Sequence, residues 1–126
     1  MVETESSIKK TLVIGASLKP EKYSNLAVNR LVNHNHPVVA VGVKSGVVAG
    51  VDISTEKTPF EGVDTITLYL NPKRQEDYYD YILSLNPKRV LFNPGTENPE
   101  LYEILAKKGI AYEAACTLVL LSTNQY

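Results

Sequence analysis

The sequence predicts an α/β fold in which a parallel five-stranded sheet lies between two layers of helices, as a three-layer sandwich. Apolar runs of strand length, rich in β-branched residues, alternate along the chain with stretches that repeat apolar side chains at helical spacing. This alternation is typical of right-handed βαβ units, which make neighbouring strands parallel. The chain has 126 residues, 44% of them hydrophobic, which suits one domain with a sizeable core.

The predicted strands are short apolar segments, as strands buried on both faces of a sheet should be. Val, Ile, Thr and Tyr, which favour strands, are frequent in them. The five strands cover residues 10–16, 37–43, 63–70, 89–92 and 110–114.

Three helices are predicted between these strands. The first begins with Ser24 as its N-cap and ends within residues 34–37. The second covers residues 75–85, and the third covers residues 99–108 with Asn98 as its N-cap. Each has apolar side chains on one face, so each is expected to pack against the sheet.

The second predicted helix carries a cluster of tyrosines. Tyr78 and Ile82 are spaced to face the sheet, which leaves Tyr79 or Tyr81 on the surface. Tyrosine is enriched in protein interfaces, so this helix is compatible with a homodimer or with an unidentified protein partner.

One connection does not follow the alternation. Residues 45–62 contain glycines and a proline but no convincing helical face, and we expect a loop or a short extra strand there. No repeat or linker divides the chain. The prediction is therefore a polar N-terminal segment over residues 1–9 and a single domain over residues 10–126.

Charge and composition exclude several classes of partner. With 13 basic and 14 acidic residues, the net charge of -1 provides no general attraction for nucleic acid or for an anionic membrane. The polar N-terminus has no apolar signal-peptide core, and no later apolar run is long enough to cross a bilayer. The single cysteine, Cys116, cannot form an internal disulfide, which suits a reducing compartment. We expect a cytoplasmic protein.

Ligands of an open parallel sheet bind beyond the carboxyl ends of its strands. Five segments are predicted to form this rim, namely residues 15–20, 42–46, 71–75, 93–98 and the stretch that begins at Cys116. The first of them favours a phosphate. Its glycine permits a sharp turn, the nearby helix start provides backbone amides, and Ser17 and Lys19 add a hydroxyl and a charge. The alternative is an ordinary strand-to-helix turn in which Ser17 bonds its own backbone.

Lys44 indicates which nucleotide the rim would hold. In dinucleotide-binding sheets the second strand usually ends in an acidic residue that binds an unmodified ribose. Here the second strand ends in Lys44, and no acidic residue follows before Asp52. A lysine favours a phosphorylated ribose, as in NADP or coenzyme A, over NAD. The alternative is a solvated lysine without a ligand.

These residues resemble the small stand-alone CoA-binding proteins, whose fold is shared with the N-terminal CoA-binding domain of the succinyl-CoA synthetase alpha subunit. The resemblance runs from about Lys10 to the C-terminus, nearly the full length. Its carriers are TLVIGAS followed by KPEKYSN, then VVAVGVKSG, TLYLNP, RVLFNPGTEN and AACTLVLL.

The resemblance implies a Rossmann-like domain that binds coenzyme A. Residues 15–17 would lie at its phosphates, Lys44 near the phosphorylated ribose, residues 69–72 along the adenine and pantetheine side, and residues 93–95 at the opposite wall. The full set of predicted ligand-binding residues is Gly15, Ala16, Ser17, Lys19, Ser24, Lys44, Leu70, Asn71, Pro72, Asn93, Pro94, Gly95 and Cys116.

Cys116 and the polar residues of the 93–98 turn are the remaining chemical candidates. The thiol follows the fifth strand and could form a mixed disulfide with coenzyme A, although inert packing is an alternative. Asn93 and Glu97 could accept hydrogen bonds from a ligand. His34 and His36 lie on the opposite rim without a third metal ligand nearby, so charge at a helix C-terminus accounts for them better than a metal site.

The rim lacks an evident pair of general acid and base, so the predicted protein is not an enzyme. Our first hypothesis is a cytoplasmic module that binds coenzyme A or an acyl-CoA in a sensor, carrier or regulatory role. The second is a small NADP-dependent oxidoreductase, and the third is an interaction domain that binds through its tyrosine face. Pathway, acyl group and oligomeric state are not evident from the residues.

Overall fold

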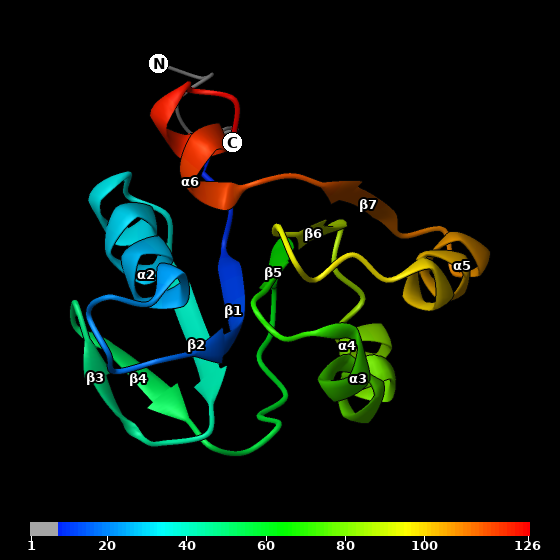
Figure 1. Cartoon of the computed structure of the whole chain (residues 1–126), viewed down its shortest axis with the longest axis horizontal. Helices are drawn as coiled ribbons and strands as arrows, with labels where there is room; N and C mark the ends of the chain where they lie inside the picture. The colour runs from blue at the N-terminus through cyan, green and yellow to red at the C-terminus, as the bar shows by residue number, and fades with distance from the viewer. Residues whose placement is uncertain (1–7) are drawn as a thin grey trace.

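The computed structural model describes residues 8–126, and Figure 1 shows how its elements are arranged. The strands are β1 (Thr11–Ala16), β2 (Val38–Gly42), β3 (Gly46–Val48), β4 (Val51–Ser54), β5 (Thr65–Leu68), β6 (Arg89–Phe92) and β7 (Ala111–Ala114). The helices are α2 (Tyr23–Asn33), α3 (Pro72–Gln75), the 3₁₀ turn η1 (Glu76–Tyr78), α4 (Tyr79–Leu85), α5 (Pro99–Lys107) and α6 (Thr117–Ser122).

The strands form one sheet in the order β3-β4-β2-β1-β5-β6-β7. All neighbours are parallel except β3 and β4, which are antiparallel. The predicted α/β fold with a parallel-dominated sheet is confirmed, but the prediction of five strands is wrong because the sheet has seven. The strand order reverses at β1, because the chain adds β2 on one side of it and later adds β5 on the other, as at the switch point of a Rossmann-like sheet.

The two additional strands come from the stretch that we expected to be a loop or a short extra strand. Val48 and Val51 pair across a two-residue turn made by Ala49 and Gly50. Both turn residues have positive φ, 51° and 80°, as the turn of a tight hairpin requires. An alanine is a rare choice for such a position, so the usual Asn-Gly or Asp-Gly signal of a hairpin is missing from the sequence.

The core lies on both faces of the sheet. Alternate residues of β1 point to opposite sides, so that Leu12 and Ile14 join one buried cluster and Val13 joins the other. The first cluster includes Ile82 of α4 and the apolar face of α5, and the second includes α2 and α6. Figure 1 shows the same division, with α2 and α6 on one side of the sheet and α4 and α5 on the other. The predicted three-layer arrangement is therefore present.

Two predicted helix starts have different outcomes. For α5 the prediction is confirmed, since the Oδ1 of Asn98 accepts a hydrogen bond from the backbone N–H of Leu101 and Pro99 occupies the first turn. For α2 it is wrong. The N-cap is Lys22, and Ser24 lies inside the first turn with its side chain buried.

The tyrosine helix also begins earlier than predicted. The Oδ1 of Asn71 accepts from the backbone N–H of Arg74 at 2.9 Å and starts α3, which continues through η1 into α4. The 3₁₀ turn changes the phase of the helix, because it has three residues per turn instead of 3.6. Tyr81 lies three residues after Tyr78, near the same face of the helix, and is buried with its hydroxyl donating to the carbonyl of Thr58, so the expectation that it could lie on the surface is wrong. Tyr79 is partly buried.

Within residues 8–126, none of the helices combines the length and the apolar composition that crossing a membrane requires.

Candidate ligand-binding site

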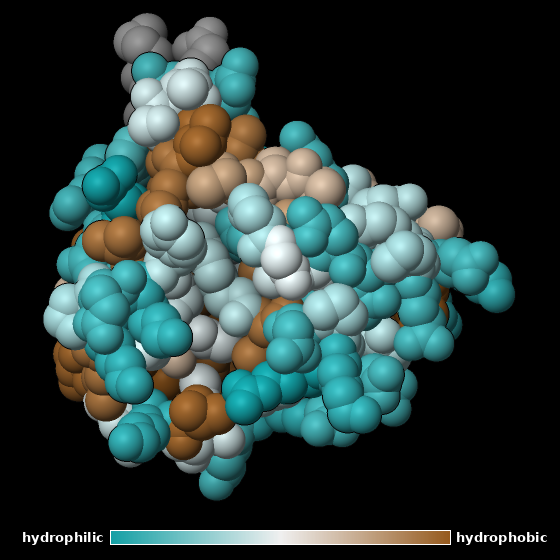
Figure 2. Space-filling model, in the orientation of Figure 1, coloured by the Kyte–Doolittle hydropathy of each residue, from teal (hydrophilic) through white to brown (hydrophobic). Residues whose placement is uncertain are grey.

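A cavity of about 650 Å³ opens at the carboxyl ends of β1, β2 and β5. Its walls come from segments that are far apart in the sequence: residues 15–19, 22–24 and 42–44, together with four side chains from the segment after β5, Tyr69, Leu70, Arg74 and Tyr78. Figure 2 shows this face of the molecule, hollowed near its centre, with hydrophilic side chains and isolated hydrophobic ones around the hollow. The position is where a Rossmann-like sheet binds its ligand.

The floor of the cavity is backbone, and two glycines make this possible. Gly15 has a φ of 94°, and a Cβ there would lie 2.9 Å from the carbonyl oxygen of Tyr69. Gly42 approaches still more closely, since a Cβ on it would lie 2.3 Å from the carbonyl oxygen of Ala16. The pairing of β1 with β2 shifts register between Ile14 and Ala16, which produces this close approach. Only residues without a side chain fit at these two positions.

The turn after β1 is held by its own hydrogen bonds. The backbone N–H of Lys19 donates to the Oγ of Ser17 at 3.1 Å, and the side-chain amide of Asn25 donates to the carbonyl of Ser17 at 2.9 Å. A further backbone bond joins Lys22 to the carbonyl of Lys19 at 3.0 Å. The expected bond of Ser17 to its own backbone is present, and its contact with a phosphate stays a prediction.

Helix α2 begins at the mouth of the cavity. Its N-cap, Lys22, makes no side-chain capping bond, and no acidic residue occupies the first turn. The first-turn amides of a helix have no partner within the helix and carry a partial positive charge. Because residues 22–24 also line the cavity, this positive helix end adds to the charge of the site.

The cavity is lined by cations. Lys19, Lys22, Lys44 and Arg74 all contribute, whereas no carboxylate does among the lining residues of the described chain. The local charge is thus positive although the whole chain carries -1. Our sequence reasoning selected Lys19 and Lys44 but missed the other two. Lys22 lies in KPEKYSN, part of the family resemblance, and Arg74 lies in NPKRQ, one of the predicted rim segments. Their positive charge could have identified both as candidates for binding an anion.

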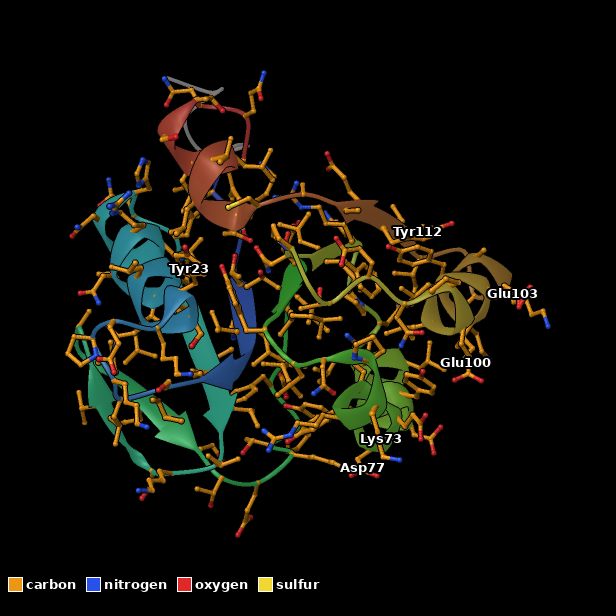
Figure 3. The ribbon with its side chains drawn as sticks, in the orientation of Figure 1. Tyr23, Lys73, Asp77, Glu100, Glu103 and Tyr112 are labelled. Carbon is orange, nitrogen blue, oxygen red and sulfur yellow. The ribbon has the colours of Figure 1, made fainter. Side chains whose placement is uncertain are left out.

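Apolar and aromatic side chains flank the cations. Leu18, Tyr23 and Val43 line the cavity although much of each side chain is exposed, with 71% for Tyr23 and 79% for Val43. Figure 3 labels Tyr23 on α2. Large side chains this exposed are available to cover an apolar group such as an adenine ring.

Some of the predicted ligand-binding residues lie outside the cavity lining. Those that line it are Gly15, Ala16, Ser17, Lys19, Ser24, Lys44 and Leu70, and those outside it are Asn71, Pro72, Asn93, Pro94, Gly95 and Cys116. The carboxylate of Glu97 accepts from the backbone N–H of Gly95 at 2.9 Å, within its own turn. Contacts of the outer set with a ligand stay predictions.

Asn93 has a structural role that its position on the rim did not reveal. Its buried side-chain amide donates to the Oγ1 of Thr67 at 2.6 Å and to the carbonyl of Leu68 at 2.9 Å. Its Oδ1 accepts from the backbone N–H of Thr117 at 2.8 Å. These bonds join the end of β5 to the start of α6, and they make Asn93 a link between the two sides of the rim.

Tyr69 lines the cavity and also lies close to Thr67 and Thr117 of this link. Its hydroxyl is buried, and burial raises its pKa to about 12, while the nearby hydroxyls of Thr117 and Thr67 lower the pKa and Cys116 raises it. Cys116 is the N-cap residue of α6 and is partly buried. The thiol is close enough to Tyr69 to influence its pKa and is not part of the cavity lining.

The histidines make local contacts away from the cavity. The Nδ1 of His34 lies 2.8 Å from the carbonyl of Arg30, at the end of α2. The Nδ1 of His36 accepts from the backbone N–H of Lys9 at 3.0 Å. Over residues 8–126, no group of three or more His, Cys, Asp or Glu side chains could hold a metal ion.

The family of the chain follows from its match to a family model. Residues 9–122 match the model of the CoA binding domain. The chain belongs to the CoA-binding domain family. The resemblance to CoA-binding proteins is thus confirmed over nearly the whole chain, and a search of curated proteins finds no match.

Solved structures share the fold of this CoA-binding domain. A crystal structure described as an uncharacterized protein is 52% identical, with a TM-score of 0.92 over 95% of this chain and 99% of that one. A conserved hypothetical protein from Pyrococcus furiosus is 25% identical, with a TM-score of 0.79 over 89% of this chain and 98% of that one. A hypothetical protein from Pyrococcus horikoshii OT3, 24% identical with a TM-score of 0.83, covers 98% of this chain and 88% of its own and shows the fold alone.

Proposed function

We propose that the protein binds coenzyme A or an acyl-CoA in the cavity at the ends of β1, β2 and β5, without a chemical step of its own. The observation that carries the proposal is the set of four cations, Lys19, Lys22, Lys44 and Arg74, around a cavity whose described lining contains no carboxylate. Cations concentrated in this way on a chain of net charge -1 favour a polyanion. Coenzyme A, with a pyrophosphate and a ribose phosphate, is such a ligand.

The distribution of the cations supports the assignment of individual groups. The pyrophosphate would lie at the turn after β1, where the start of α2 and Lys19 face the cavity. The phosphorylated ribose would lie at the end of β2 beside Lys44. Arg74 enters from the opposite wall and can bind phosphate oxygens with two donors.

The described lining of the cavity contains no histidine and no carboxylate, which favours a binding role over catalysis. Tyrosines and lysines of the lining could exchange protons, so the proposal of a binding role rests on the concentration of cations. A sensor, carrier or regulatory role in the cytoplasm follows as part of the proposal. A homodimer and a protein partner stay predictions, and the burial of Tyr81 leaves less tyrosine surface for them than we expected.

NADP is the second candidate ligand, because a lysine at the end of β2 would fit its ribose phosphate as well as that of coenzyme A. An NADP-dependent oxidoreductase would additionally need a proton donor beside the nicotinamide. The two candidates differ in the ligand that they select.

Native mass spectrometry tests this choice. The protein is mixed with equal concentrations of coenzyme A, NADP and NAD, and the mass of the bound species identifies the ligand. We expect one coenzyme A per chain and little of the other two. Selection of NADP, or no adduct with any of the three, would contradict the proposal.

A pair of charge-reversal variants tests whether the cations act as a binding site. Replacing Lys22 and Arg74 by Glu (K22E with R74E) should abolish the adduct, because it places two carboxylates in the cavity. The matched control replaces Lys107 and Lys108 by Glu (K107E with K108E). These two exposed lysines lie at the end of α5, outside the cavity lining, so the same change in net charge should leave the adduct intact.

A further inference from the structure

The hydroxyl of Tyr69 is a buried polar group without a partner. Over residues 8–126 it is the single buried side-chain nitrogen or oxygen that makes no hydrogen bond. Burying a hydroxyl without a partner is unfavourable, and such a group in a native fold calls for an explanation, often a ligand or a water that completes it.

The polar groups around Tyr69 are already committed to one another. The Oγ1 atoms of Thr67 and Thr117 lie 2.7 Å apart, and the side-chain amide of Asn93 donates to Thr67 as well. The remaining oxygen of Asn93 accepts from the backbone of Thr117. The threonine hydroxyls are close enough to lower the pKa of Tyr69 as hydrogen-bond donors, but no atom of this network accepts the hydrogen of the Tyr69 hydroxyl.

Tyr69 also stands at a boundary within the site. It lines the cavity that holds the four cations, while its hydroxyl points away from them toward the start of α6 and interacts electrostatically with Cys116. A ligand whose anionic end occupies the cationic cavity, and whose other end extends toward α6, must pass this side chain. In coenzyme A that other end is the pantetheine arm, an uncharged chain with two amides and a terminal thiol.

We propose that the hydroxyl of Tyr69 donates a hydrogen bond to an amide carbonyl of the pantetheine arm, and so distinguishes complete coenzyme A from its nucleotide portion. The inference rests on the proposed function. A phenol that stays protonated at neutral pH is a donor, and burial keeps Tyr69 so. The hydroxyl is covered in this structure, so the proposed contact requires the wall at Tyr69 to open when the arm enters.

The test compares two ligands on one variant. Tyr69→Phe removes the hydroxyl and keeps the ring that lines the cavity. Coenzyme A should bind roughly 2- to 13-fold more weakly, the range expected for one hydrogen bond. Adenosine 3′,5′-bisphosphate, which has the phosphorylated ribose and no arm, should bind as it does to the wild type. Tyr112→Phe, at a partly exposed tyrosine of β7 outside the cavity lining, is the matched control and should leave both affinities unchanged.

The outcomes separate the inference from the proposal on which it rests. Equal loss of both ligands would mean that Tyr69 supports the cavity as a whole, and unchanged affinity for coenzyme A would mean that the hydroxyl is not used. Either result overturns the inference and leaves coenzyme A binding in place. If wild-type protein binds no coenzyme A, both fail. Unfolding in urea verifies that the variant is folded, which we expect because it loses only an unpaired polar group.

Discussion

Replacing Gly42 by alanine should strain the centre of the sheet and the floor of the cavity together. Gly42 pairs with Ala16 where the register of β1 and β2 shifts, and both residues line the cavity. A Cβ at residue 42 would lie 2.3 Å from the carbonyl oxygen of Ala16. Close carbon–oxygen contacts between strands have separations of about 3.3 to 3.6 Å. The two strands would therefore have to separate by about 1 Å.

The cost follows from the kind of atom that must move. The obstacle is backbone in two central strands, which are packed between helices on both faces, so it cannot rotate away. Overpacking of this kind costs about 1 to 3 kcal/mol. The free energy of unfolding should fall by that amount in Gly42→Ala, and coenzyme A should bind more weakly because the floor of its cavity has shifted.

Gly46→Ala is the matched control. A Cβ there would also come close to another atom, at 2.5 Å, but that atom is the end of the flexible side chain of Leu18, which is 40% exposed and can turn aside. Neither Gly42 nor Gly46 has a positive φ, so the two substitutions differ mainly in what the new methyl group meets. Urea unfolding should show a change within about 0.5 kcal/mol for Gly46→Ala. Equal destabilisation of the two variants, or none in Gly42→Ala, would refute the reasoning.

Two further predictions concern pH and the rim. Burial, and then the charge of Lys9, lower the pKa of His36 below 6.5, so the unfolded chain binds more protons near that pH and the free energy of unfolding should fall as the pH drops below about 6.5. Denaturation at pH 7.5 and 5.5 should show this loss in the wild type and in His34→Gln but less of it in His36→Asn, and an unchanged slope in His36→Asn would contradict it. Asn93→Ala should lower the free energy of unfolding by about 1 to 3 kcal/mol, because it removes the partner of the backbone N–H of Thr117 and of the carbonyl of Leu68. Glu97→Ala, an exposed change in the same turn, is the control and should change the free energy of unfolding by no more than about 0.5 kcal/mol. Similar urea midpoints for the two variants would rule this out.

The alternation of parallel strands and helices along the chain was predictable because buried strands and amphipathic helices leave different periodicities. The β3–β4 hairpin was not, since its turn uses Ala49 at a positive φ, where glycine or asparagine is the usual signal. The possible surface position of Tyr81 was mispredicted because Tyr81 lies three residues after Tyr78, near the face that Tyr78 and Ile82 present to the core.

The residues of the candidate site also fall into those that the sequence could predict and those that it could not. Residues of the turns that follow β1 and β2, such as Ser17 and Lys44, were predictable because the carboxyl ends of parallel strands share one edge. Arg74 and Tyr78 enter the cavity from α3 and η1, whose placement depends on packing across the sheet. The missing partner of the Tyr69 hydroxyl depends on how Asn93 and Thr117 use their hydrogen bonds, which no local pattern reveals.

The central claim is that the cationic cavity binds coenzyme A through its phosphates, and a calorimetric titration of the reduced protein tests it most directly. Coenzyme A is compared with dephospho-coenzyme A, which lacks the ribose phosphate. Loss of one charge-assisted contact should cost about 1.5 to 3 kcal/mol, or roughly 10- to 150-fold in affinity. We expect one coenzyme A per chain, bound more tightly than dephospho-coenzyme A by a factor in this range. Equal affinity for the two would remove the ribose phosphate contact assigned to Lys44, and no binding of coenzyme A would contradict the account as a whole.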